Sequence, residues 1–197
     1  MLTPRQQAAL TQAFSLSLQH GVPVDVTRLF TTRTLRRGQC VLRQGDIWDT
    51  ATVIHSGLLR MVFTRRDGRE FNKSFHREAM LVCPITDAMA QQPSLFSIIA
   101  VEPCVLLQAP AARLRAALAA CDAWEPLRSA LLERLLTRKL EREYNLLAMD
   151  GRSRYAHFRR TEPELAARVP LAQLATYLGI TDVSLSRIRR DEKKRRD

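Results

Sequence analysis

The 197-residue sequence lacks features that would assign it to several other classes of protein. Its 7 glycines are far too few for collagen, and its 46% hydrophobic content excludes intrinsic disorder. No run approaches the ~18 apolar residues of a membrane-spanning helix, and no secretory signal opens the chain. The four cysteines, Cys40, Cys83, Cys104 and Cys121, form no C-x-x-C pair, so we expect reduced thiols in a cytoplasmic protein.

Signatures of catalysis and cofactor binding are also missing. The sequence has no G-x-S-x-G elbow, no H-E-x-x-H motif and no Walker loop, so we expect no enzyme activity. Iron–sulfur clusters are held by grouped cysteine thiolates, whereas Cys40 is the only cysteine before residue 83. His55, His76 and His157 are potential haem ligands, but an isolated histidine is usually an ordinary surface or packing residue. We therefore expect no cofactor and no metal.

Acidic residues are scarce relative to basic ones, above all near the C-terminus. Residues 151–197 carry 12 Lys and Arg against 6 Asp and Glu, whereas the preceding 150 residues carry 19 against 14. The chain as a whole has a formal net charge of +11. Concentrated positive charge favours a polyanionic partner such as nucleic acid or an anionic membrane surface, so we predict a separate C-terminal domain with a partner of its own. A solvated basic face without function is the alternative.

Regular turn signals in the first half predict β structure. Gly38, Gly45, Gly57 and Gly68 separate short β-prone runs, and Asp67-Gly68 is typical of a hairpin turn. This spacing predicts a small antiparallel barrel or roll. The expected strands cover residues 40–43, 52–55, 58–64, 70–75, 97–102 and 104–108. Ahead of them, a capping box of Thr3 and Gln6 around Pro4 predicts the start of a helix.

The pattern becomes helical after Pro110, first over residues 111–120 and then in a long helix over residues 124–149. The apolar residues of the long helix form two rows. One row is Trp124, Leu127, Leu131 and Leu135, and the other is Leu132, Leu136, Leu140, Tyr144 and Leu147. Two rows exceed a single apolar stripe, so we expect two neighbours: the β-roll of the same chain and the same helix of a second subunit. Burial within one monomer is the alternative.

Residues 171–190 carry the most specific pattern of the chain, a predicted helix-turn-helix. Ala175 is the small residue where the two helices touch, and Gly179 four positions later accepts the positive φ of the turn. Thr181 is placed to cap the second helix. The expected packing residues are Leu174, Leu178, Leu185 and Ile188.

The second helix of this motif exposes polar and cationic side chains. The predicted DNA-binding residues are Thr181, Ser184, Ser186, Arg187, Arg189 and Arg190. The guanidinium of Arg187 can bond guanine O6 and N7 together, whereas Arg189 and Arg190 are expected to contact phosphates. Further phosphate contacts are expected from Lys193, Lys194, Arg195 and Arg196. Pairing of Arg187 with an acid of its own chain is the alternative.

The chain resembles the Crp/Fnr family of bacterial transcription regulators from about residue 30 to residue 190. The matching motifs are Arg37-Gly38-Gln39, Gln44-Gly45-Asp46, Ile54-His55-Ser56-Gly57, Asp67-Gly68-Arg69-Glu70, Tyr177-Leu178-Gly179-Ile180-Thr181 and Ser184-Leu185-Ser186-Arg187. The resemblance implies an α+β fold: an antiparallel β-roll of the jelly-roll type with flanking helices. It implies a sensor-type domain over residues 1–123, a dimerisation helix over 124–150 and a helix-turn-helix domain over 151–197. The implied partners are double-stranded DNA with an inverted-repeat operator, a second copy of the chain, and RNA polymerase.

Three departures from the family pattern limit what the resemblance implies. Cyclic-nucleotide-binding members hold the phosphate with a Gly-Glu pair and a later Arg, but here Ser94 or a neighbour aligns with the Arg. No Arg or Lys lies between Glu78 and Arg113. Glu78 and Ser94 are thus weak candidates for a ligand pocket, and we expect cyclic nucleotides to bind weakly or not at all. In the second helix Val183 replaces the usual Glu, and we expect the basic tail to contact phosphates in place of a β-hairpin wing.

Two other functions stay open on the sequence alone. One is a sensory or assembly module that acts through protein contacts and uses the helix-turn-helix for packing. The other is a regulatory subunit of an enzyme that binds an anionic ligand. Binding to a specific operator favours the transcription regulator. Unchanged partner assembly after Arg187→Ala, without DNA affinity, favours the other two functions.

Overall fold

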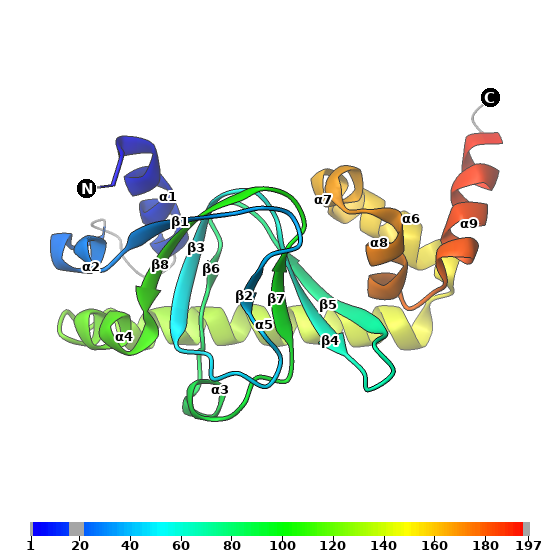
Figure 1. Cartoon of the computed structure of the whole chain (residues 1–197). Helices are drawn as coiled ribbons and strands as arrows, with labels where there is room; N and C mark the ends of the chain where they lie inside the picture. Colours follow the sequence, from blue (N-terminus) through cyan, green and yellow to red (C-terminus); the bar gives the residue numbers. More distant parts are fainter. Residues whose placement is uncertain (1, 16–21, 195–197) are drawn as a thin grey trace. The chain divides into compact units, whose positions relative to one another are not determined.

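The computed structural model describes residues 2–15 and 22–194, and Figure 1 shows a β-roll with helices beside it and a C-terminal group of helices. The strands are β1 (Thr31–Leu35), β2 (Cys40–Leu42), β3 (Thr50–Ser56), β4 (Leu59–Thr64), β5 (Glu70–His76), β6 (Leu81–Val82), β7 (Ser97–Ala100) and β8 (Cys104–Pro110). The helices are α1 (Pro4–Phe14), α2 (Val24–Arg28), α3 (Asp87–Gln91), α4 (Ala111–Ala119), α5 (Trp124–Ala148), α6 (Gly151–Thr161), α7 (Pro163–Arg168), α8 (Leu171–Leu178) and α9 (Asp182–Lys194).

The strands form two four-stranded sheets, in the orders β1-β8-β3-β6 and β2-β7-β4-β5. The pairs β1–β8, β3–β8, β3–β6 and β2–β7 are antiparallel. The turn between β4 and β5 closes on Gly68, whose φ is 80°. The α+β fold with an antiparallel roll and C-terminal helices, expected from the sequence, is confirmed.

Large apolar side chains fill the interior of the roll. This cluster takes its members from both sheets, and Trp48 packs edge-on against Phe96 with ring centroids 5.5 Å apart. Its other buried members are Leu35, Leu42, Ile54, Leu59, Met61, Val82, Ile98, Ala100, Cys104 and Leu106. Burial of this much apolar surface is the main source of stability for the roll.

The opposite faces of β3 and β8 pack against helices. Figure 1 shows α1, α2 and α4 beside β1 and β8, and Val53 and Leu107 are fully buried on this side. Trp124 and Leu127 at the start of α5 belong to the same cluster, and Leu131 packs against it while partly buried. Three residues of the first apolar row, Trp124, Leu127 and Leu131, therefore pack on the core of their own chain, one of the two neighbours expected for the long helix.

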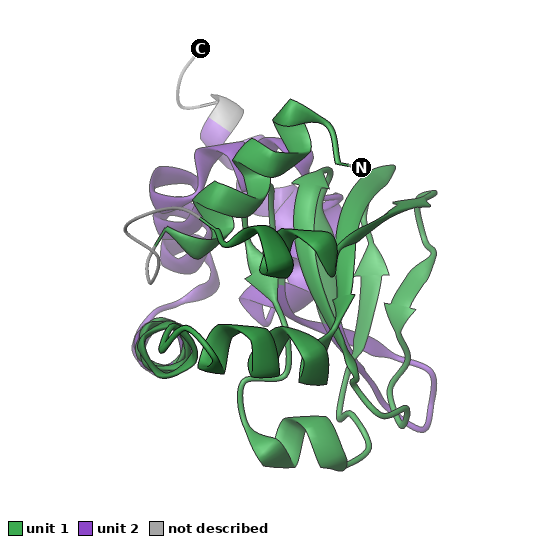
Figure 2. Ribbon diagram, turned by 90° about the vertical axis from the view of Figure 1, so that its left-hand side faces the viewer, with its two compact units in different colours: residues 1–61, 75–135 green, residues 62–74, 136–197 purple. Residues whose placement is uncertain are grey.

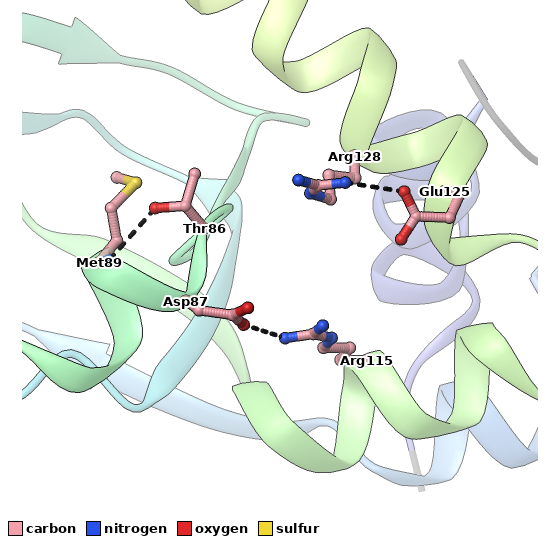
Figure 3. Close-up of polar contacts among 6 residues, drawn as sticks. All are labelled: Thr86, Asp87, Met89, Arg115, Glu125 and Arg128. Atoms are coloured by element: carbon pink, nitrogen blue, oxygen red, sulfur yellow. Dashed lines mark hydrogen bonds and ion pairs between the residues drawn. The ribbon is translucent and has the colours of Figure 1, made fainter.

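Helix starts and ion pairs fix the helices around this core. Thr3 and Gln6 make the capping box of α1 that the sequence predicts. At α3, the Met89 N–H donates to the Thr86 hydroxyl over 3.2 Å, and Asp87 pairs with Arg115 of α4 (Figure 3). On the first turn of α5, Arg128 pairs with Glu125 at 2.8 Å (Figure 3).

The chain forms two compact units, which Figure 2 shows in different colours. Unit 1 contains Met1–Met61 and Phe75–Leu135, and unit 2 contains Val62–Ser74 and Leu136–Asp197. The tip of the β4–β5 hairpin thus belongs to the same unit as the helix-turn-helix. The division into a sensor-type domain, a dimerisation helix and a DNA-binding domain stays a prediction.

Candidate nucleic-acid interface

The turn between α8 and α9 has the geometry of a helix-turn-helix. Gly179 ends α8 in the left-handed conformation, with φ 68° and ψ 34°. The Ile180 N–H donates to the Ala175 carbonyl over 3.1 Å, which closes the end of the helix. A Cβ at Gly179 would lie 3.0 Å from the Leu146 side chain of α5, so both backbone conformation and space require glycine here.

The start of α9 is held by two of the predicted DNA-binding residues. The hydroxyl of Thr181 accepts from the Ser184 N–H at 3.1 Å and donates to the Ser184 hydroxyl at 2.8 Å. Asp182 lies in the first turn, where a carboxylate is favoured by the helix dipole. Thr181 and Ser184 therefore have a capping role within the chain.

One side of α9 packs into unit 2. Leu185 is fully buried and Ile188 is half-buried. Farther along, Asp191 pairs with Arg152 at 3.1 Å and Glu192 pairs with Arg159, both on α6. Sequence reasoning did not find these pairs, because the acids lie inside a basic run. The pairs direct Asp191 and Glu192 toward α6.

The opposite side of α9 is exposed and basic. Val183, Ser186, Arg187 and Arg190 follow the spacing i, i+3, i+4, i+7, so they share one face of the helix. All four are exposed, Val183 at 74%. Arg189 is exposed as well but lies to one side of this face. Among the ion pairs of the described residues, none involves Arg187.

The tail residues predicted to contact phosphates fall at the end of the described chain. Lys193 and Lys194 belong to the last turn of α9. Arg195 and Arg196 lie outside the described residues.

Glu78 and Ser94 make their hydrogen bonds at different turns of the roll. The Glu78 carboxylate accepts from the Gly57 N–H at 2.9 Å, next to the turn between β3 and β4. The Ser94 hydroxyl donates to the Phe96 carbonyl at 2.8 Å, and the Ser94 backbone pairs with the turn at Gly45 and Asp46. An open hollow of 540 Å³ on unit 1 includes neither residue among those that line it.

Comparison with known proteins identifies the fold. Residues 32–121 match the family described as the cyclic nucleotide-binding domain. FixK2 from Bradyrhizobium japonicum is similar in structure, with a TM-score of 0.74 and 16% identity over 84% of this chain and 85% of that one. A CooA variant from Carboxydothermus hydrogenoformans has a TM-score of 0.70 and 19% identity over 90% and 82% of the two chains.

The c-di-GMP-responsive regulator CLP from Xanthomonas campestris has a TM-score of 0.67 and 19% identity over 85% and 88% of the two chains. The chain has the Crp/Fnr fold. Among curated proteins, no sequence matches it. In the terms of the Crp/Fnr fold, residues 32–121 are the cyclic-nucleotide-binding-type roll and α8–α9 are the helix-turn-helix.

Apolar side chains fill the interior of the roll. The cluster of Trp48, Phe96 and their neighbours takes its members from both sheets of the roll. Glu78 holds a backbone turn, and Ser94 holds its own loop. Hydrogen bonds within the roll therefore give Glu78 and Ser94 a structural role that needs no ligand.

Metal, thiol and membrane features of the described chain are sparse. Within residues 2–15 and 22–194, no group of three or more His, Cys, Asp or Glu side chains could hold a metal ion. All four cysteines are free thiols, and burial raises the pKa of Cys83 to about 12, which makes this thiol unreactive. None of the helices described is long and apolar enough to span a membrane.

Proposed function

We propose that this chain is a dimeric transcription regulator of the Crp/Fnr type that binds a specific DNA sequence. The observation that carries the proposal is the exposed face of α9, where Ser186, Arg187 and Arg190 stand together beyond a helix-turn-helix turn. A helix fits the major groove of B-DNA, and a guanidinium on its outer face can bond two acceptors of guanine. We expect the protein to act in the cytoplasm, with RNA polymerase as a further partner.

The proposed reading of DNA assigns different roles to neighbouring arginines. Arg187 lies in the middle of the exposed face and is proposed to contact a base edge. Arg189 lies beside the face and is proposed to contact a phosphate, which positions the helix without reading sequence. Val183 offers a methyl contact to thymine but no acceptor for cytosine, so the half-site differs from that of family members with Glu there.

The proposed dimer uses the second apolar row of α5. Leu136, Leu140, Tyr144 and Leu147 are each more than half exposed, although they form a continuous stripe over twelve residues. An apolar stripe of this length is typical of a surface that another helix covers. Two copies of α5 packed along the stripe would set two recognition helices about one DNA turn apart, so an inverted-repeat operator is expected.

The test begins with selection of bound sequences from a random DNA pool at a stated salt concentration. Arg187→Ala should weaken the free energy of binding to the selected operator by ~1–3 kcal/mol, and that to random DNA by much less. Arg189→Ala removes the same charge from the same helix and is the matched control. It should weaken both kinds of DNA to a similar extent.

Salt dependence provides the second arm of this test. Replacing Lys193, Lys194, Arg195 and Arg196 with alanine should weaken binding to both DNAs and flatten the dependence on salt, because fewer counterions are released. Equal losses for Arg187→Ala on operator and random DNA would remove it from base reading. Selection that enriches no sequence would overturn the proposed function and favour a module that acts through protein contacts.

A further inference from the structure

A polar cluster within unit 2 joins the β4–β5 hairpin to the first helix of the helix-turn-helix. Its members are Asn72 of β5, Arg142 of α5, and Gln173, Thr176 and Tyr177 of α8. We call these five residues the clasp. They lie far apart in the sequence, yet all belong to one compact unit.

Asn72 binds α8 through its side chain. The residue is only 2% exposed. Its amide nitrogen donates to the Thr176 hydroxyl at 2.7 Å and to the Gln173 carbonyl at 3.0 Å. A buried amide that loses such partners pays the full cost of leaving water, so these bonds hold the hairpin on α8.

Arg142 closes the C-terminal end of α8. The last carbonyls of a helix lack partners inside the helix and carry a partial negative charge. One of them, the Tyr177 carbonyl, accepts from the Arg142 guanidinium at 2.8 Å, and the guanidinium lies 4.4 Å from the centre of the Tyr177 ring. The same group donates to the Asn72 carbonyl at 3.3 Å, so it bridges the hairpin and α8.

The clasp lies directly before the turn on which DNA reading depends. Tyr177 is two residues from Gly179, and the Tyr177 ring also packs against Phe158 of α6 at 5.5 Å between centroids. A helix end that frays would release the turn and, with it, the start of α9. Contacts at Tyr177 therefore bear on the placement of Arg187 without touching DNA.

We propose that the clasp makes the β4–β5 hairpin a working part of the DNA-binding unit, with Asn72 and Arg142 as positioning residues for α8. The proposal goes beyond the proposed function and uses it for one of two readouts.

Hydrogen exchange of the full chain tests the clasp without DNA. Arg142→Gln and Asn72→Ser should each speed amide exchange in residues 171–180 by about tenfold. The first removes a hydrogen bond to the Tyr177 carbonyl at the end of α8, and the second removes the amide bonds to Gln173 and Thr176 within it. Arg138→Gln is the matched control, since Arg138 is an exposed arginine one turn earlier on α5. It should leave exchange in residues 171–180 unchanged. The milder Asn72→Ser variant decides the matter if Arg142→Gln fails to fold.

Operator binding supplies the second readout. Both clasp variants should bind the selected operator several-fold more weakly, with the loss exceeding that of Arg138→Gln, although neither residue is on the exposed face of α9. Unchanged exchange in residues 171–180 for both variants would overturn the clasp. Faster exchange with operator affinity equal to that of Arg138→Gln would also overturn it as a positioning device. A wild-type chain that binds no DNA would instead overturn the proposed function, while exchange still decides whether the clasp holds α8.

Discussion

The exposed stripe of α5 allows the dimer to be tested with a sharp substitution. Leu136 and Leu140 are 59% and 57% exposed, so covering each is worth ~1–2 kcal/mol. A two-fold dimer buries each residue twice, so replacing both with glutamate removes ~4–8 kcal/mol from the free energy of dimerisation. Burying four carboxylates at an apolar interface weakens the dimer further. Since about 1.4 kcal/mol is tenfold in Kd, the double variant should be at least several hundred-fold weaker as a dimer.

Light scattering at micromolar concentration measures this directly. Leu136→Glu with Leu140→Glu should give the mass of one chain, whereas the wild type should give twice that mass. Arg138→Glu is the control, because it adds the same carboxylate to an exposed position of α5 away from the stripe. Leu131 is unsuitable for this purpose, because it packs against the core of its own chain. A double variant that keeps the wild-type fold and stays dimeric would refute the stripe as the interface.

Three further predictions concern the roll, the turn and the hairpin. Cyclic AMP and cyclic GMP should show no micromolar binding by calorimetry, since no Arg or Lys lies between Glu78 and Arg113; a micromolar Kd would show that a cation enters the roll from elsewhere. Gly179→Ala should lower the free energy of unfolding, measured with urea, by ~1–2 kcal/mol, because the φ of 68° at this position disfavours a Cβ. An unchanged urea midpoint would contradict this. Burial, with the charges of Lys139 and Arg142, lowers the pKa of Lys73 to about 8 from 10.5. The unfolded chain then holds more protons between pH 8 and 10.5, and stability should rise with pH across this window. Lys73→Met should remove this rise and add up to ~2–3 kcal/mol to the free energy of unfolding at pH 7. An identical dependence of stability on pH in both proteins would contradict this role of Lys73.

Local signals in the sequence predict much of the fold. Thr3 and Gln6 make the expected capping box, and Gly179 takes the expected positive φ, because both depend on residues only a few positions apart. The six expected strands are present with shifts of one or two residues at their ends. The two apolar rows of α5 were also predictable, since helical periodicity alone defines them.

Elements without such signals were not predictable. Strand β1 has the sequence TTRTL, four of whose five residues are exposed, so its pairing with β8 leaves no alternating pattern. Strand β6 has only two residues, and the short helices α2 and α3 have five each. Among candidate site residues, the sequence places Arg187 on the second helix and Thr181 at its cap, where Thr181 accepts from the Ser184 N–H. It gives no hint of the added bond between the two hydroxyls.

The clasp shows a different limit of sequence reasoning. Asn72 is 104 positions from Thr176, and Arg142 is 35 positions from Tyr177. Neither polar residue belongs to a periodic pattern or a turn motif. Only the folded chain brings them together, so their role follows from tertiary packing rather than from local propensity.

The discontinuous make-up of unit 2 has a consequence for how the protein is made. Residues 62–74 leave the ribosome long before their partners on α8, with Phe75–Leu135 of unit 1 synthesised in between. The roll can therefore assemble early, while its hairpin tip waits for the last quarter of the chain. Long-range pairings of this kind form late, because the intervening loop must be closed first. Completion of the helix-turn-helix unit then depends on a finished roll, and a chain whose roll misfolds presents α8 without its partner on the hairpin.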